Sequence, residues 1–150
     1  MASKSCKPEQ SNWLTPYLWV KDVSEAMQEY QQAFGFEAGT TMPGSTGKIA
    51  HGEMNYQGRL LIMLGAEGLM GVTLRSPQTS GAASPVGLYV YCEDVDQVAS
   101  QAVAAGMTLV DSVQDMFWGD RIANLRDSNG YAWTFATRVG EFDPSKAPPM

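Results

Sequence analysis

The chain has 150 residues, of which 44% are hydrophobic and 17% are charged, so it can bury a core and does not have the composition of a disordered protein. Its formal net charge of -6 disfavours phosphate backbones and anionic membrane surfaces, so we expect neither nucleic acid nor a membrane as a partner. No apolar run is long enough to span a bilayer, and no apolar stretch follows the first lysines, which favours a cytoplasmic protein.

Cysteine and histidine are scarce. Cys6 lies in a polar stretch and Cys92 in an alternating apolar run, so we expect no disulfide between them. His51 is the single histidine, which excludes a zinc site built from several histidines and leaves one residue to serve as the base of any Ser-His-Asp site.

The predicted elements repeat along the chain after a polar tail over residues 1–13. The segment Leu18–Val23 resembles Val90–Val95, and the two aspartates, Asp22 and Asp94, are 72 positions apart (94 − 22). In each copy an alternating strand leads directly into a helical pattern. Chance similarity between two amphipathic helices is the alternative, but the matching strand favours a duplication.

The signals at the helix ends also match between the two copies. The two expected capping boxes are Asp22 with Glu25 and Asp94 with Gln97, and the expected stops are Gly35 and Gly106. Three strand-like runs then follow each helix. They are residues 37–42, 48–56 and 59–64 in the first half, and 107–114, 120–126 and 131–137 in the second. Each copy therefore predicts a βαβββ module. We expect module 1 over 14–66, a linker over 67–84, module 2 over 85–139, and a C-terminal tail over 140–150.

Alternation along the strands separates an apolar face from an aromatic, partly polar face. The apolar set, expected to pack under the helices, is Leu18, Val20, Leu60, Ile62, Leu64, Leu88, Val90, Cys92, Trp133 and Phe135. The other set includes the expected ligand-binding residues Tyr17, Trp19, Met63, Tyr89, Tyr91 and Thr134. Bulky aromatic residues on the side away from the helices favour the wall of a ligand cavity, with a second core or a dimer contact as the alternative.

Several motifs now identify a family resemblance. They are Thr15–Val20, the Asp22-Val23 helix start, Ala33–Phe36, Phe117–Arg121, Leu125–Asp127 and Gly130–Trp133. Their order over residues 14–139 resembles the vicinal oxygen chelate superfamily of glyoxalases, bleomycin and fosfomycin resistance proteins and dioxygenases, and within it the bleomycin-resistance-like branch. The resemblance implies an α+β fold in which tandem βαβββ modules form a cup-shaped, eight-stranded mixed sheet with helices on its outer face, in a homodimer.

Metal-dependent members of that superfamily place a His, Gln or Glu ligand on the first and last strand of each module. The resemblance carries these four places to Thr15, Met63, Gly87 and Thr134. Threonine is a weak ligand, methionine is too soft for hard divalent ions, and glycine has no side chain. We therefore expect no metal and no other cofactor, which favours the metal-free binding proteins of the superfamily.

Two short motifs are candidates for chemistry. His51 and Glu53 lie two apart on one predicted strand, so they share a face and are the candidate catalytic pair. An incidental solvated pair, or a metal site without further ligands, are the alternatives. Trp118 offers a flat apolar wall, and Arg121 could bind a ligand carboxylate or phosphate, unless Arg121 instead pairs with Asp120 to stabilise the turn.

Two functions follow from these residues. The first is a metal-free homodimer that binds a small aromatic or cationic organic molecule in its cleft, as in antibiotic sequestration. The alternative is a metal-independent lyase or isomerase that uses His51 and Glu53 for proton transfer and Arg121 to hold an anionic substrate.

Overall fold

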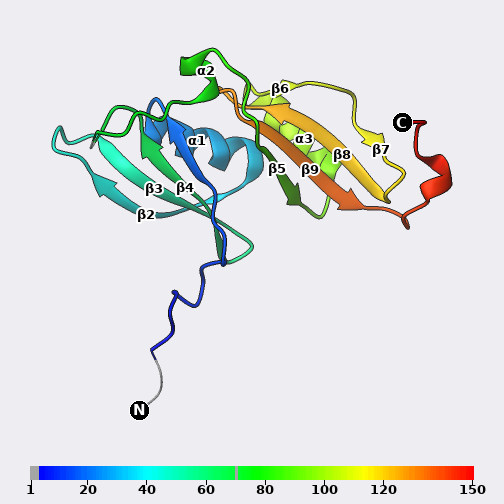
Figure 1. The fold of residues 1–150 in the computed structure, drawn as a ribbon, viewed down its shortest axis with the longest axis horizontal. Coiled ribbons are helices and arrows are strands. Elements are labelled where there is room, and N and C mark those ends of the chain that lie inside the picture. The colour runs from blue at the N-terminus through cyan, green and yellow to red at the C-terminus, as the bar shows by residue number, and fades with distance from the viewer. Residues whose placement is uncertain (1–3, 70) are drawn as a thin grey trace.

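Each half of the chain folds into the strand-helix-strands order that its sequence predicts. The computed structural model describes residues 4–69 and 71–150 and is drawn in Figure 1. Module 1 contains β1 Tyr17–Val20, α1 Val23–Phe34, β2 Glu37–Pro43, β3 Ile49–Tyr56 and β4 Arg59–Ala66. Module 2 contains β5 Gly87–Tyr91, α3 Val95–Ala104, β6 Thr108–Leu109, β7 Gln114–Asp115, β8 Asp120–Arg126 and β9 Ala132–Arg138. The predicted α+β class with tandem modules is confirmed.

Local signals set the ends of both long helices. The Asp22 carboxylate accepts a hydrogen bond from the Glu25 amide at 3.0 Å, and Asp94 caps α3 through Gln97 in the same way. Gly35 ends α1 with a left-handed φ of 69°, a conformation that costs a residue with a Cβ atom about 1 kcal/mol. The predicted starts of both helices are therefore correct.

The strands form two sheets. Module 1 has the order β1-β4-β3-β2, and module 2 has β5-β9-β8-β6, with β7 also pairing with β8. The first strand of each module is parallel to the last, and the other neighbours are antiparallel. Within the described ranges no strand of one sheet pairs with a strand of the other. The predicted strand over 107–114 is divided: it contains all of β6 and only the first residue of β7, because the exposed polar pair Asp111 and Ser112 interrupts it.

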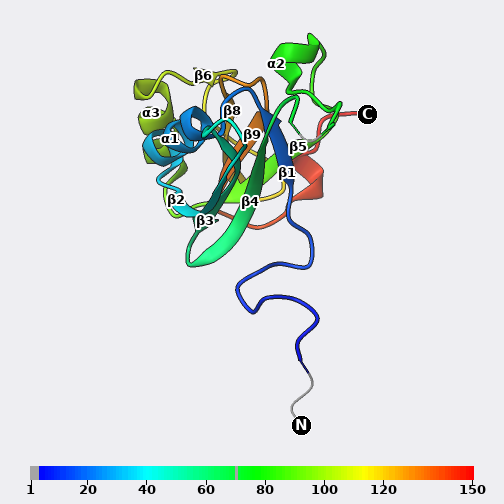
Figure 2. The ribbon, with the colours of Figure 1, turned by 90° about the vertical axis from the view of Figure 1, so that its left-hand side faces the viewer.

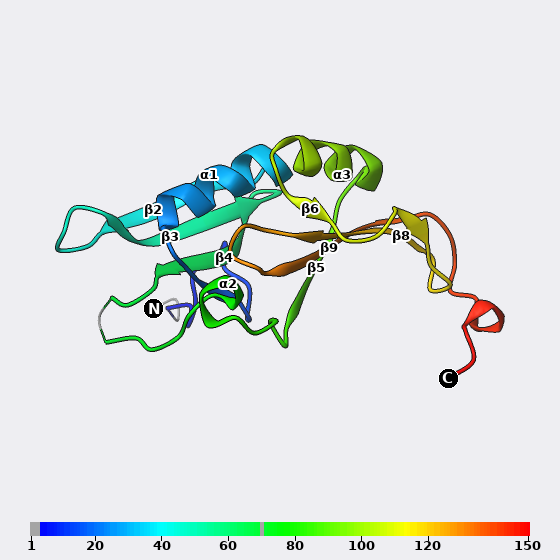
Figure 3. The same cartoon turned by 90° about the horizontal axis from the view of Figure 1, so that it is seen from above.

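Both helices cover the same side of the two sheets, which lie side by side (Figure 3). The core fills the space between helices and sheets, and its aromatic centre draws on both modules: Phe34 of α1 packs on Trp133 and Phe135 of β9 with ring centroids 5.1 and 4.4 Å apart. The apolar face predicted from strand alternation is buried here, apart from the half-buried Cys92. One continuous core therefore joins the two modules.

A buried carboxylate ties the modules together. Asp127 accepts hydrogen bonds from the Tyr30 hydroxyl of α1 at 2.6 Å and from the Trp133 indole at 2.9 Å, and its other oxygen accepts from the Asn129 and Tyr131 amides. Burial raises the pKa of Asp127. The Tyr131 hydroxyl in turn bridges to the backbone of Trp19 in β1. These contacts fix module 2 against module 1.

The predicted linker holds a short helix, α2 Pro77–Ser80, that is fastened at both ends. Glu67 accepts hydrogen bonds from the Ser76 amide at 2.7 Å and the Thr79 hydroxyl at 2.9 Å, and Gln78 donates to the Asn129 carbonyl. The N-terminal segment runs away from the modules (Figure 2), and the C-terminal segment contains a 3-10 turn, Pro144–Lys146. Among the described residues, no helix is both long and apolar enough to cross a membrane.

Candidate functional site

The sheet surfaces turned away from the helices are open to solvent, and we call them the open faces of module 1 and module 2. Their residues follow from strand register. Module 1 presents Tyr17, Trp19, His51, Glu53, Met63 and Gly65, and module 2 presents Tyr89, Tyr91, Asn124, Arg126, Thr134 and Ala136. Tyr17, Tyr89 and Tyr91 remain 42, 46 and 60% exposed. Since both helices cover the same side, the open faces lie next to each other and do not face one another.

On module 1, a glycine in the middle of the sheet gives two aromatic rings room to lie flat. Gly65 of β4 is in register with Trp19 on one side and His51 on the other. A Cβ atom added to Gly65 would come within 2.7 Å of Trp19 Cε3 and 2.8 Å of Tyr17 Cε1. The two rings stack over this position with centroids 4.9 Å apart. Gly65 therefore shapes the aromatic surface of module 1.

The same gap lets Tyr17 reach His51 across β4. The Tyr17 hydroxyl lies 2.7 Å from His51 Nδ1, and His51 Nε2 lies 3.7 Å from a Glu53 carboxylate oxygen. Burial raises the pKa of Tyr17, so the phenol keeps its proton at neutral pH. With the imidazole proton on Nε2, facing the carboxylate, Nδ1 accepts the hydrogen bond from Tyr17. The candidate catalytic pair thus lies beside Tyr17 and Trp19.

A pocket of about 350 Å³ opens beside this group. Tyr17, Trp19 and His51 line it from the middle of the sheet. Apolar residues complete it: Met42 and Pro43 from the end of β2, and Leu69 and Val72 from the linker. Such a mixture of an apolar wall with a few polar groups is typical of small-molecule sites.

On module 2, two tyrosines converge on one buried carboxylate. The hydroxyls of Tyr89 and Tyr91 donate to the same oxygen of Asp120 at 2.7 and 2.8 Å, and the Trp118 indole donates to the Tyr89 hydroxyl at 3.1 Å. Asp120 is 4% exposed. Burial, and then the bond to Asp120, raise the pKa of Tyr89 to about 12, so Tyr89 stays a donor at neutral pH.

The remaining predicted residues divide between the two sides of the sheets. Met63 lies next to Tyr17 and Glu53 on module 1, and the Thr134 hydroxyl bonds the Asn124 side chain at 2.8 Å on module 2. Arg121, however, projects from the other side of β8. It donates to Asp96 of α3 at 2.8 Å and to Asp115 at 2.9 Å. Arg121 therefore does not join the aromatic residues, and the expected pairing of Arg121 with Asp120 is wrong, because successive residues of a strand point to opposite sides.

Sequence reasoning passed over Gly65, Asn124 and Arg126, and it assigned Asp120 only to a turn. For Asn124 and Arg126, the available signal was the alternation of side-chain directions along β8. Asn124 and Arg126 alternate with the buried Ala123 and Leu125, so they share the open face. Nothing local distinguishes Gly65 from other glycines.

The resemblance implies four ligand positions, Thr15, Met63, Gly87 and Thr134, and these residues do not fit a metal. The Thr134 hydroxyl is bonded to Asn124, Met63 and Gly87 offer no oxygen or nitrogen side-chain donor, and the hydroxyl of Thr15 is a weak ligand. Over residues 4–69 and 71–150, no three His, Cys, Asp or Glu side chains gather in a way that could hold an ion.

Comparison with known proteins gives the family and the fold. The model of the Glyoxalase/Bleomycin resistance protein/Dioxygenase superfamily matches residues 10–135. An uncharacterized protein of Mycobacterium bovis is 32% identical over 130 residues, which cover 85% of this chain and 84% of the relative. An uncharacterized protein of Mycobacterium tuberculosis has the same identity, with 85% of this chain and 75% of the relative covered.

Solved structures show the same fold. TioX from Micromonospora sp. ML1 has a TM-score of 0.62 at 24% identity, covering 84% of this chain and 99% of that chain. The fosfomycin resistance protein FosX from Listeria monocytogenes has a TM-score of 0.65 at 14% identity, covering 85% and 94%. The fold shared with these structures agrees with the family match over residues 10–135. The chain belongs to the glyoxalase/bleomycin resistance protein/dioxygenase superfamily, as its motifs predict.

Proposed function

We propose that this protein binds a small organic molecule with a planar, aromatic part in the pocket of module 1. The observation that carries the proposal is the stacked pair of Tyr17 and Trp19, held flat over Gly65 at the wall of a pocket of about 350 Å³. A ligand ring that packs on this pair buries large apolar area at a low cost in side-chain entropy, because the rings are already held in place.

Charge favours a neutral or cationic ligand over an anionic one. Glu53 lies beside His51 next to the pocket, and the whole chain carries a formal net charge of -6. The superfamily includes resistance proteins, and the structural neighbour FosX is one of them. Sequestration of an antibiotic is therefore the first specific function to test, with glycopeptide and aromatic antibiotics as the panel.

We also propose that the protein works as a homodimer. The two open faces lie side by side, and Tyr17, Tyr89 and Tyr91 on them are 42, 46 and 60% exposed. A second copy placed over these faces would cover the exposed tyrosines and close the site. Sedimentation velocity at micromolar concentration tests this, and a monomer throughout that range would contradict it.

The binding proposal is tested by a thermal-shift panel followed by calorimetry on each compound that raises the melting temperature, since a ligand that binds the folded state must raise it. Trp19→Ala should weaken binding by on the order of tenfold or more, because it removes one aromatic wall. Trp13→Ala is the matched control: Trp13 is 83% exposed and lies outside the pocket. Equal affinity of both variants, or no shift with any compound, refutes the proposal.

A second candidate is a metal-independent lyase or isomerase, which the Tyr17–His51–Glu53 arrangement favours. In this reading the imidazole and the carboxylate move a proton between the ligand and Tyr17. Arg121 could not hold the substrate there, because it lies across the sheet with Asp96. His51→Ala separates the two functions: loss of turnover with intact folding supports the enzyme, whereas unchanged ligand binding supports the binding protein.

The expectation that no metal takes part has its own test. Protein purified without chelators should contain no stoichiometric zinc, nickel, iron or manganese by elemental analysis, because the superfamily's ligand positions hold Thr15, Met63, Gly87 and Thr134. Retention of one equivalent of any of these metals after gel filtration would contradict this expectation.

A further inference from the structure

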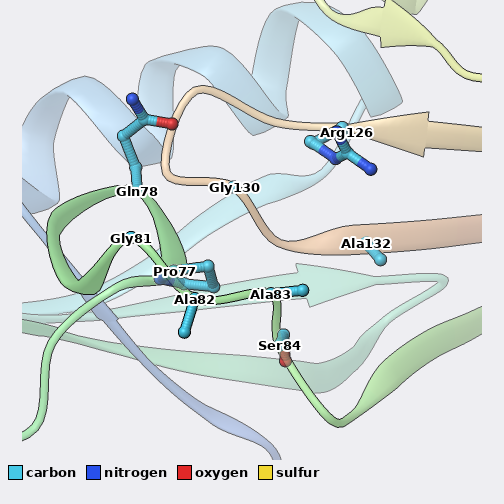
Figure 4. A pocket seen from close by; sticks show the side chains of 9 residues that line it. All are labelled: Pro77, Gln78, Gly81, Ala82, Ala83, Ser84, Arg126, Gly130 and Ala132. Carbon is cyan, nitrogen blue, oxygen red and sulfur yellow. The ribbon is translucent and has the colours of Figure 1, made fainter.

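A second cavity of about 350 Å³ lies where module 2 meets the linker (Figure 4). Arg126 and Ala132, from the ends of β8 and β9, form one side, and the linker residues 81–84 form the other. Arg126 is the single charged residue among those that line it. A water molecule occupies about 30 Å³ of liquid, so the cavity has room for roughly ten waters or for a small organic molecule.

Arg126 has no partner of its own in the part of the chain that the structure describes. Its guanidinium makes no hydrogen bond or ion pair with residues 4–69 or 71–150, whereas Arg121 pairs with two aspartates and Arg138 with Glu141. Arg126 is in register with Ala132, whose small side chain leaves the guanidinium accessible. A planar fork of five N–H donors matches the oxygens of a carboxylate or phosphate.

The side of this cavity that α2 and Gly130 form is fixed before any ligand arrives. The Gln78 amide donates to the Asn129 carbonyl at 2.9 Å, which fastens α2 to the turn between β8 and β9. Gly130 lies against α2 so closely that an added Cβ atom would be 3.0 Å from Pro77 Cβ. On the opposite wall, the amides of Ala83 and Ser84 give no hydrogen bond within the described ranges, so they are free to donate to a ligand. A wall that is already in place lowers the entropy cost of binding a ligand against it.

We infer that this cavity binds the carboxylate or phosphate group of a small organic acid, with Arg126 as its anchor. The oxyanion replaces the water around the guanidinium, and the small side chains of Ala82, Ala83 and Ala132 leave space for the body of the acid. The site is separate from the aromatic pocket of module 1, so anion binding at Arg126 does not depend on whether that pocket binds a ligand.

The test is an NMR titration of the whole chain at low ionic strength with three probes: inorganic phosphate, phenyl phosphate and benzoate. Saturable shifts of the Ala83, Ser84 and Gly130 amides are expected with at least one probe, and the tightest probe identifies the anion. Arg126→Gln should weaken that probe by about tenfold or more, since it removes the charged hydrogen bonds. Arg126→Lys should weaken it less, because it keeps the charge and loses the fork.

Arg59→Gln is the control, since it removes the same charge from an exposed position at the start of β4. It should leave the affinity nearly unchanged. The proposal is overturned if no probe gives saturable shifts, or if the Arg59 and Arg126 variants lose the same affinity, which would show a general charge effect.

Discussion

Replacing Gly65 by alanine tests whether the aromatic surface of module 1 depends on one missing side chain. The new Cβ atom would meet Trp19 Cζ3 most closely and Cε3 at 2.7 Å, and ordinary contact begins near 3.4 Å, so the ring must move by more than about 0.7 Å. Tyr17 must move by a similar amount, from 2.8 Å. Its hydroxyl then leaves His51 Nδ1, to which it is bonded at 2.7 Å in the native protein.

The effect on folding should be small and the effect on the site large. Overpacking costs about 1–3 kcal/mol, but one side of these rings faces solvent, so the cost should fall near the lower end. The better strand propensity of alanine offsets about 0.5–1 kcal/mol of it. We therefore expect a loss of about 1 kcal/mol or less in urea unfolding, together with about tenfold weaker binding of any compound that the thermal-shift panel identifies.

Near-ultraviolet circular dichroism reports on the packing of Tyr17 and Trp19 in the absence of a ligand. The aromatic signal should change in the Gly65→Ala variant. Gly87→Ala is the matched control, because it adds the same atom on the open face of module 2, where nothing lies within 4 Å of the new Cβ. If both variants keep the native dichroism and the native affinity, Gly65 does not shape the site and the reasoning is refuted.

Two further changes should destabilise the fold by very different amounts. Asp127→Ala leaves the Tyr30 hydroxyl and the Trp133 indole without their buried acceptor, so urea unfolding should show a loss of roughly 3 kcal/mol or more. Since burial raises the pKa of Asp127, its carboxyl contributes most to stability below its ordinary pKa near 4 and loses that contribution as the pH rises through the raised value. The stability gap between wild type and this variant should therefore narrow from acidic toward neutral pH, and a gap that widens would contradict the burial. Arg121→Gln should lower the melting temperature slightly and leave ligand affinity unchanged, because its partners Asp96 and Asp115 lie away from the open faces.

The scaffold was predictable because its signals are local. Asp22 and Asp94 cap the helices that follow them, Gly35 ends α1, and alternation along β1 and β5 separates buried from exposed residues. Each of these features depends on a few neighbouring residues and on the period of the element.

The two arginines of β8 show why the side of the strand must be assigned before a residue is proposed as a ligand contact. Arg121 and Arg126 are five positions apart, so they must point to opposite sides of one strand. The turn motif before Arg121 suggested a ligand site, but Arg121 points to the same side of β8 as the buried Ala123 and Leu125. That is the helix side, where Arg121 meets Asp96. The strand itself was correctly bounded, so attention to its parity would have pointed to Arg126.

The contact between Tyr17 and His51 could not be derived from the sequence alone. The contact depends on the strand order β1-β4-β3, because Tyr17 in β1 and His51 in β3 are 34 residues apart and β4 lies between them. It also depends on Gly65, the residue of β4 that is paired with His51, because the Tyr17 side chain crosses β4 there. Strand order and register are properties of the folded sheet, and a one-residue slip would turn His51 to the other face.

The two modules share one scaffold, and different residues at matched positions make two different open faces. Equivalent positions by register are Tyr17 and Tyr89, Trp19 and Tyr91, Gly65 and Ala136, and His51 and Ile122. Where module 1 has glycine, the ring of Trp19 lies flat on the sheet and Tyr17 turns toward the histidine. Where module 2 has Ala136, Tyr91 stands 60% exposed and its hydroxyl extends to Asp120. The methyl group of Ala136 in module 2, which Gly65 lacks in module 1, therefore separates a polar, hydrogen-bonded surface from an apolar stacking one, and this is why we propose module 1 as the site of the aromatic ligand.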